Sequence, residues 1–475
     1  MWARPQIHFR FCRHDPFRTL ERGASGFYEL QPQDHDDYRE AVRQDITARV
    51  EEAFTVQILT AAYVVVVHDS TIRLSRWDRA GTVFSRKVDY TTDPSVLTEV
   101  FWRLSMLTNH QLGMDPTATA VLPGSDEYKL MDRLSVPRAD DFSHEEGTVI
   151  EGDPEDPSRT FAYIRETLHT CLHNLKKDSI FDGVSPRWKV SVPLEDGSVR
   201  EFLVCKPFSY RSPQKPRIDR RNGKAYIAID CTTEKLVFLK DVWRFTDVDA
   251  GKLSEREGLV LKQLNEAGVS NVPTLLCEAE LPEQETKTQH YKPRYHWTPD
   301  DDSISYSDIV AGLDLDEPVG PQPRPQLDDH EIHCVDYSGE DIGELHHYRM
   351  VVSEFCFSLS SSFRGGRQLV QGIRDCIFGM CSTCPDRLRV VLTHSICLRS
   401  LLAHFRAVEV LGRLHCDISF PNIMAYPRIE VSDETGKPTI RWAGMLIDWE
   451  LNRRIKEMRI LPQRLMELVR VHLSY

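Results

Sequence analysis

The chain has 475 residues, of which 41% are hydrophobic and 28% are charged, enough for two or three domains with apolar cores. Its formal net charge of -13 disfavours nonspecific nucleic-acid binding, and no apolar run is long enough to span a membrane. The first residues form no signal-peptide h-region, so we expect the 12 cysteines to be reduced thiols in the cytoplasm or nucleus.

Residues 1–195 are predicted to form an α/β module. Apolar side chains recur at helical spacing over residues 34–54, where Tyr38, Val42 and Ile46 share one face. Three strands are expected next, at residues 56–67, 71–77 and 82–90. A second helix over residues 94–107 would place four apolar side chains on one face, those of Val96, Val100, Phe101 and Leu104.

The middle of the chain is predicted to be richer in strands. An acidic loop at residues 145–158 and a helix at residues 160–175 precede it. Four strands are expected, at residues 188–193, 200–206, 225–229 and 236–239. The later elements are a helix at residues 254–267, a strand at residues 348–354 and a helix at residues 366–378.

Residues 279–345 are acidic and contain several prolines, a composition that predicts a long, poorly ordered insertion. The expected organisation therefore has four segments, residues 1–195, 196–278, 279–345 and 346–475.

Two short segments near the C-terminus carry the strongest chemical signal. Residues 415–422 begin with His415 and contain Asp417 and Asn422, and a later apolar strand ends at Asp448. Phosphoryl transfer needs an acid that orients the acceptor hydroxyl and hard oxygen ligands that hold Mg²⁺. Asp417 is the candidate base, and Asn422 and Asp448 are the candidate metal ligands. Asp417 and Asn422 alone could form an Asx turn, but the combined spacing predicts a kinase-like site.

An upstream strand and helix supply the remaining charges. Lys240 ends an apolar strand and can direct its ammonium toward nucleotide phosphates. Glu257, in the following helix, is the candidate partner of Lys240, and Glu255 is a competitor on another face of that helix. Arg221 and Lys224, which flank Gly223 before the strand predicted at residues 225–229, could supply compensating positive charge for the phosphates. Other basic residues of the preceding loop, Arg211, Lys215, Arg217 and Arg220, are further candidates for phosphate contacts.

With these residues in place, the chain resembles the fungal-type protein kinases. Residues 73–81 resemble part of that family's N-terminal region, residues 238–244 its lysine strand, residues 347–354 its hinge strand and residues 415–422 its catalytic loop. The resemblance implies an α+β, two-lobed protein-kinase-like fold preceded by the α/β module. It also implies ATP and Mg²⁺ as cofactors and a protein substrate phosphorylated on Ser, Thr or Tyr.

The resemblance also implies a set of site residues. Asp417, Lys240 and Glu257 would be catalytic, and Asn422 and Asp448 would hold the metal. The nucleotide would be contacted by Lys240, Gly223, Glu354, Asn422 and Asp448.

Four features depart from the family pattern. Cys416 stands where an arginine normally precedes the catalytic aspartate, and Gly223 is the single glycine expected in the phosphate-covering turn. Residues 379–402 interrupt a predicted helix and are interpreted as a retained intron. The chain ends at Tyr475 in a predicted basic helix, so the C-lobe is expected to be truncated.

These departures leave two functions open. The first is an active protein kinase, and the second is a catalytically impaired pseudokinase or interaction module. A zinc site at Cys381 and Cys384 is disfavoured because no second ligand pair has matching spacing. A nuclease is also disfavoured, because no Asp and Glu-x-Lys set converges on the predicted strands.

Overall fold

The structure is a computed structural model of the 475-residue chain. It describes residues 7–13, 16, 33–85, 88–173, 185–208, 223–245, 255–290, 333–334, 344–358, 400, 403–418, 420–433 and 435–454. Most of the predicted insertion, the helix predicted at residues 366–378, nearly all of residues 379–402 and the predicted C-terminal helix lie outside these ranges. Among the described helices, none is long and apolar enough to cross a membrane.

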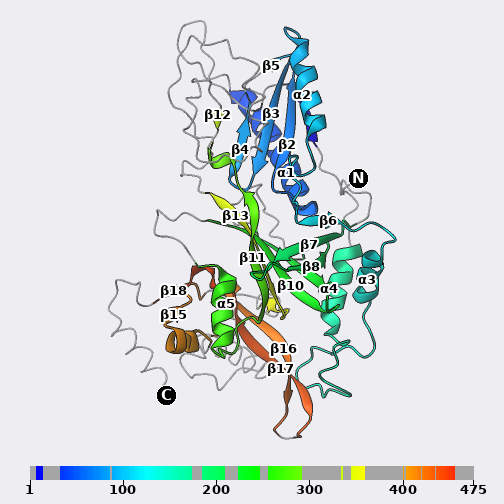
Figure 1. Cartoon of the computed structure of the whole chain (residues 1–475), viewed down its shortest axis with the longest axis vertical. Helices are drawn as coiled ribbons and strands as arrows, with labels where there is room; N and C mark the ends of the chain where they lie inside the picture. Colours follow the sequence, from blue (N-terminus) through cyan, green and yellow to red (C-terminus); the bar gives the residue numbers. More distant parts are fainter. Residues whose placement is uncertain are drawn as a thin grey trace.

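The first sheet lies at one end of the molecule (Figure 1). Its strands follow the order β1 (Ile7–Cys12), β2 (Ala62–His68), β3 (Thr71–Asp78), β4 (Gly81–Phe84) and β12 (His333–Cys334), and β5 (Val88–Asp89) also pairs with β3. β1 runs parallel to β2, whereas the other pairs are antiparallel. The run of β-branched residues in β2 explains its burial on both faces.

Two helices pack on this sheet. α1 (Gln33–Val56) buries Val42, Ile46 and residues beyond them, whereas Tyr38 is exposed. α2 (Pro94–Met106) begins at Asp93, whose side chain accepts from Ser95 N at 3.0 Å. Val96, Val100 and Leu104 are buried, but the prediction for Phe101 was wrong: it is 38% exposed. One residue turns a helix by about 100°, so Phe101 lies beside the apolar stripe.

A seven-stranded sheet forms the middle of the molecule (Figure 1). Its order is β11 (Leu275–Glu285), β13 (Leu345–Val352), β10 (Leu236–Phe245), β9 (Lys224–Asp230), β8 (Val199–Val204), β7 (Trp188–Pro193) and β6 (Ala118–Ala120). α5 (Glu257–Glu266) packs on one face with Val260, Leu261 and Leu264. α3 (Asp126–Ser135) and α4 (Ala162–His173) cover a neighbouring part of the same sheet.

The opposite face of the seven-stranded sheet shares a core with the N-terminal region. Ile46 and Phe54 of α1 lie in one apolar cluster with Phe202, Val237 and Leu239 of the sheet. Side chains alternate between faces along a strand, so Val237 and Leu239 face α1 while Lys240 faces the other way. The N-terminal region therefore packs on the face of β10 opposite to Lys240.

The remaining elements form the other end of the molecule. β16 (Ile423–Val431) and β17 (Pro438–Leu446) make a long antiparallel hairpin, and β14 (Phe357–Ser358) pairs with β16. β15 (Arg413–Leu414) pairs with β18 (Arg453–Arg454), and residues 403–411 form a helix. Short 3-10 turns complete the described elements, η1 (Thr288–His290), η2 (Phe420–Asn422) and η3 (Trp449–Leu451).

The mixture of helices and sheets confirms the α+β class. The predicted boundary at residue 195 falls between β7 and β8, which pair in one sheet. The insertion predicted from residue 279 overlaps β11, which continues to Glu285. The division into domains stays a prediction, but both boundaries fall in or between paired strands.

Candidate active site

Lys240 and Glu257 meet between β10 and α5. Lys240 Nζ lies 2.7 Å from Glu257 Oε2, and the Glu257 residue is only 4% exposed. α5 can approach the sheet closely because its second residue is Gly258, where a Cβ would collide with the side chains of Glu278 and Tyr348. Gly258 N donates to the Tyr348 hydroxyl at 2.9 Å, which fixes the first turn of α5. Gly258 thus brings the Glu257 carboxylate within reach of Lys240.

Asp448 completes a three-residue charge cluster with these two side chains. Its Oδ1 lies 2.9 Å from Lys240 Nζ. Asp448 follows β17 in the left-handed region, with φ 65° and ψ 59°, a conformation that aspartate tolerates better than most residues. The next residue, Trp449, donates its backbone N–H to Glu257 Oε1 at 3.1 Å. Each Glu257 oxygen therefore has one partner, and α5 is bound to the chain that follows β17.

Asp417 and Asn422 lie together on the loop before β16. Asn422 Nδ2 donates to the backbone oxygen of Asp417 and to its Oδ2, both at 3.0 Å. Asn422 is 7% exposed, and its backbone oxygen accepts from Ile447 N at 2.9 Å, which ties the loop to the end of β17. The predicted Asp417 and Asn422 pair is thus adjacent in space and connected to the segment that carries Asp448.

The His415 ring contacts both the loop of Asp417 and the segment that follows β17. Its Nε2 lies 2.9 Å from the backbone oxygen of Ile447, and Asp417 N donates to its Nδ1 at 3.3 Å. Burial lowers the pKa of His415, so the neutral ring donates at one nitrogen and accepts at the other. The ring also meets Trp449 edge-on, with 4.6 Å between centroids. Cys416, between His415 and Asp417, is exposed with φ 65°.

The electrostatics favour a charged lysine at the centre of the cluster. Burial opposes the ammonium, but the carboxylates of Glu257 and Asp448 outweigh it and raise the pKa of Lys240. Burial raises the pKa of Glu257 against the opposing effect of Lys240. We take Lys240 as protonated and hydrogen-bonded to both acids, because two oxygens lie within 3 Å of one nitrogen.

Glu255, the alternative partner of Lys240, faces elsewhere. Its Oε2 lies 2.7 Å from Arg413 Nη2, and Arg413 is almost fully buried. Arg413 also donates to Gln263 Oε1 at 2.6 Å and to Asn452 Oδ1 at 2.7 Å. Sequence reasoning missed this role of Arg413, because its partners are distant in sequence.

Glu354 and Gly223 are not brought into the charge cluster. The Glu354 carboxylate accepts from Thr274 N at 2.8 Å and from Thr274 Oγ1 at 2.6 Å. Lys240 is paired with Met350, which puts Glu354 about 13 Å farther along the chain. Gly223 is exposed directly before β9, and the preceding turn lies outside the described residues. Their predicted nucleotide contacts stay predictions, and for Glu354 they would have to come from the backbone.

The segment around α4 contacts the chain that follows β13. Tyr163 donates its hydroxyl to the backbone oxygen of Phe355 at 2.8 Å. Residues 147–150 bond to the edge of β17, and Glu146 Oε2 accepts from Trp442 N at 2.6 Å. The N-terminal half of the chain therefore contacts both the seven-stranded sheet and the β16–β17 hairpin, which the sequence did not indicate.

Lys224 does not face the charge cluster, so its predicted phosphate role was wrong. It pairs with Asp241 and therefore projects toward the N-terminal region, where its Nζ lies 3.4 Å from the backbone oxygen of Gln57. Burial, reinforced by Arg79, lowers the pKa of Lys224 to about 7. The sequence shows a lysine at the start of a strand but not which face of the sheet it occupies.

The burial of Lys224 is predicted to lower the free energy of unfolding by an amount that depends on pH. Between pH 7 and the ordinary lysine pKa of 10.5 the unfolded chain binds a proton that folded Lys224 does not, so stability rises with pH across this window. We expect Lys224→Met to raise the free energy of unfolding at pH 7 by at least ~1 kcal/mol, with a smaller gain near pH 10. Melting temperatures at both pH values measure this, with exposed Lys235→Met as the control. Equal stability of Lys224→Met and the parent at pH 7 would contradict the expectation.

The described site joins a strand lysine to a helix glutamate and to an aspartate, and a nearby loop pairs an aspartate with an asparagine. Protein kinases use residues of these types for phosphoryl transfer. A comparison with protein families gives a match to the family described as fungal protein kinase over residues 24–143. Residues 24–143 are thus similar to the fungal-type protein kinases, the family that the motifs indicated. The match covers about a quarter of the chain, in the N-terminal region rather than at the charge cluster. No curated protein matches the chain.

Proposed function

We propose that the chain is a protein kinase that transfers the γ-phosphoryl group of ATP, with Mg²⁺, to Ser, Thr or Tyr hydroxyls of a protein. The observation that carries the proposal is Lys240 Nζ held at 2.7 Å from Glu257 and 2.9 Å from Asp448. Kinases use this lysine to bind nucleotide phosphates and this glutamate to orient it. The proposal includes a two-lobed fold, with the seven-stranded sheet and α5 in one lobe and the β16–β17 hairpin in the other.

The donor set fits the cofactors that this function requires. Asn422 and Asp448 offer side-chain oxygens, the hard ligands that Mg²⁺ prefers. Asn422 uses its amide nitrogen to bond Asp417, which turns its amide oxygen away from Asp417. We assign Asn422 and Asp448 to the metal and Lys240 to the phosphates. When bound, Mg²⁺ neutralises charge on the β- and γ-phosphate oxygens.

Asp417 has the geometry of the residue that orients the acceptor. Asn422 holds its Oδ2 at 3.0 Å, which leaves Oδ1 to accept a hydrogen bond from an incoming hydroxyl. The backbone N–H of Asp417 donates to the His415 ring, so Asp417 is held both at its backbone and at one carboxylate oxygen. Asp417 would take the hydroxyl proton as the new P–O bond forms, and the departing ADP would carry the electron pair of the broken bond.

Phosphorylation assays with radiolabelled ATP·Mg²⁺ and a generic protein acceptor, beside calorimetric ATP binding, test the proposal. We expect Asp417→Asn to lower the rate about 10³-fold and leave ATP affinity within about 3-fold, because Asp417 contacts the acceptor rather than the nucleotide. Lys240→Met should weaken ATP binding. The matched control is Asp433→Asn, an exposed acid in the turn between β16 and β17.

Three outcomes separate the candidate functions. Turnover that depends on Asp417 supports the kinase. ATP binding without turnover in the parent protein supports the alternative, a pseudokinase or interaction module. Failure of the parent protein to bind ATP in the presence of Mg²⁺ would overturn both nucleotide-based proposals.

A further inference from the structure

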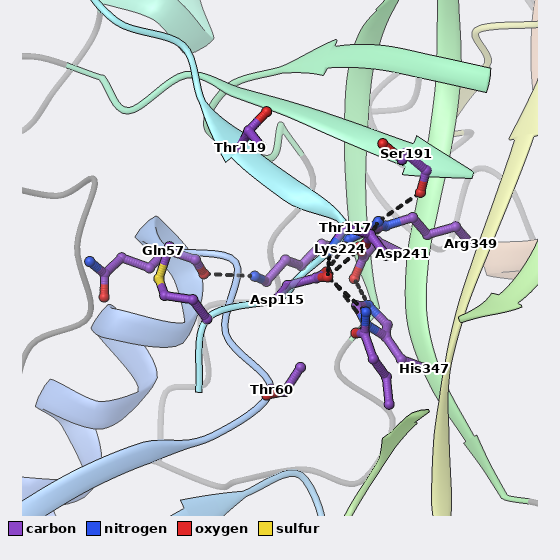
Figure 2. A network of polar contacts seen from close by, with 12 residues as sticks. Gln57, Thr60, Asp115, Thr117, Thr119, Ser191, Lys224, Asp241, His347 and Arg349 are labelled. Carbon is purple, nitrogen blue, oxygen red and sulfur yellow. Dashed lines mark hydrogen bonds and ion pairs between the residues drawn. The ribbon is translucent and has the colours of Figure 1, made fainter. Parts of the chain in front are cut away.

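A buried polar network joins the N-terminal region to β10 and β13 (Figure 2). Arg349 on β13 lies between two carboxylates: its Nε donates to Asp241 at 2.9 Å and its Nη2 donates to Asp115. Thr117 Oγ1 accepts from Arg349 at 2.6 Å and contacts Asp115 at 2.6 Å. Asp115, Asp241 and Arg349 are 1%, 5% and 0% exposed. Three charged groups are thus buried together, each with an opposite charge beside it.

A second chain of contacts links the same two carboxylates. His347 Nε2 lies 2.9 Å from Asp241 Oδ1, and its Nδ1 lies 2.6 Å from Gln284 Oε1. Gln284 Nε2 donates to Asp115 Oδ1 at 2.7 Å. The His347 ring stacks on Trp243, with centroids 4.7 Å apart and planes 3° from parallel. Asp115 and Asp241 are therefore connected twice, once through Arg349 and once through His347.

The network lies directly behind the proposed phosphate lysine. Asp241 follows Lys240 on β10, so their side chains project from opposite faces of the strand. The register places Lys240 opposite Met350 and Asp241 opposite Arg349. Lys240 faces Glu257 and Asp448, whereas Asp241 faces Asp115. Any shift of the Asp241 backbone therefore shifts the base of the Lys240 side chain.

We propose that Asp115 is a positioning residue for nucleotide phosphates, acting through Arg349 and Asp241 on the Lys240 ammonium. The inference rests on the proposed function, in which Lys240 contacts the phosphates. It makes the N-terminal region part of the phosphate-binding unit, because Asp115 comes from the loop between α2 and β6.

The burial of Asp115 and Arg349 explains how a change at Asp115 would move β10. Burial opposes a charge on Asp115, but Arg349 and His347 outweigh it and lower the pKa of Asp115. Without that carboxylate, the fully buried Arg349 keeps Asp241 as its one remaining acid in the network. A buried guanidinium that loses an acid must rearrange toward other acceptors, and β13 and its partner β10 would move with it.

The test measures how Asp115 and Lys240 depend on each other. We expect Asp115→Asn in the full chain to weaken binding of ATP·Mg²⁺ and ADP·Mg²⁺ about 10-fold and to leave adenosine affinity within 2-fold. In a Lys240→Met background the same substitution should have no further effect on ATP affinity. Asp141→Asn is the matched control, since it breaks another buried Asp–Arg pair, with Arg165, that does not contact β10. Thr117→Val is a milder variant for the case in which Asp115→Asn does not fold.

Equal weakening of ATP and adenosine by Asp115→Asn would overturn the inference, because it would show a general loss of structure. An undiminished effect in the Lys240→Met background would also overturn it. If the parent protein binds no ATP, the proposed function fails and the phosphate-positioning role fails with it, whereas melting temperatures without nucleotide still test the structural coupling of Asp115 to Lys240. Non-additive temperature shifts for Asp115→Asn and Lys240→Met would support coupling between the residues, and additive shifts would reject it.

Discussion

Glu257→Gln is expected to lower phosphoryl transfer about 100-fold, the order found when one preorganised hydrogen-bonding group is removed from an active site. The amide can still accept from Trp449 N, so the change removes mainly the negative charge at 2.7 Å from Lys240. Lys240 would then keep Asp448, the proposed metal ligand, as its remaining hydrogen-bonded carboxylate among the described residues. Rates with radiolabelled ATP and ATP affinities measure the effect.

The matched control for this substitution is Glu255→Gln, two residues earlier in the chain. Glu255 pairs with Arg413, whereas Lys240 pairs with Glu257 and Asp448, so we expect phosphoryl transfer to change less than 3-fold. Equal losses in the two variants would mean that α5 acts through its stability rather than through the Lys240–Glu257 pair. An unchanged rate in Glu257→Gln would remove the pair from the proposed mechanism.

Much of the candidate site could be predicted because several of its residues lie close together in the sequence. The Asp417–Asn422 spacing puts both side chains on one loop, and Asp448 follows its strand directly. The sequence also favours Glu257 over Glu255 as the partner of Lys240, once Glu257 is considered, since residues two positions apart on a helix face different directions. The geometry agrees with that choice, with Glu257 at Lys240 and Glu255 at Arg413.

Long-range register explains what the sequence could not show. Lys224 and Lys240 both lie on predicted strands, but the pairing of Lys224 with Asp241 sends the Lys224 side chain to the N-terminal region. The Asp115–Arg349 contact joins residues 234 positions apart, and no spacing rule predicts it. β1, β6, α3 and β16 were also missed, partly because β6 is only three residues long. Each depends on pairing or packing with distant segments rather than on a local pattern.

Trp449→Ala is expected to lower the free energy of unfolding by about 3–5 kcal/mol, the range for truncating a large buried aromatic side chain. Trp449 is 0% exposed and packs in the apolar cluster that includes Val260 and Leu264 of α5. Its indole Nε1 donates to the backbone oxygen of Leu446 at 3.0 Å, so the substitution also leaves a buried carbonyl without that donor.

The position of Trp449 makes its loss functional as well as structural. It lies beside His415 and directly follows Asp448, so a cavity there would loosen the loop of His415, Asp448 and α5 together. Thermal and urea denaturation measure the stability, with Trp102→Ala, a 57% exposed tryptophan on α2, as the matched control expected to change it by less than ~0.5 kcal/mol. Trp449→Phe should lie between the parent and Trp449→Ala, because it keeps a ring and loses the N–H. A loss below ~1 kcal/mol in Trp449→Ala would contradict the central packing role, because a 0% exposed tryptophan can be that dispensable only if its neighbours close the cavity.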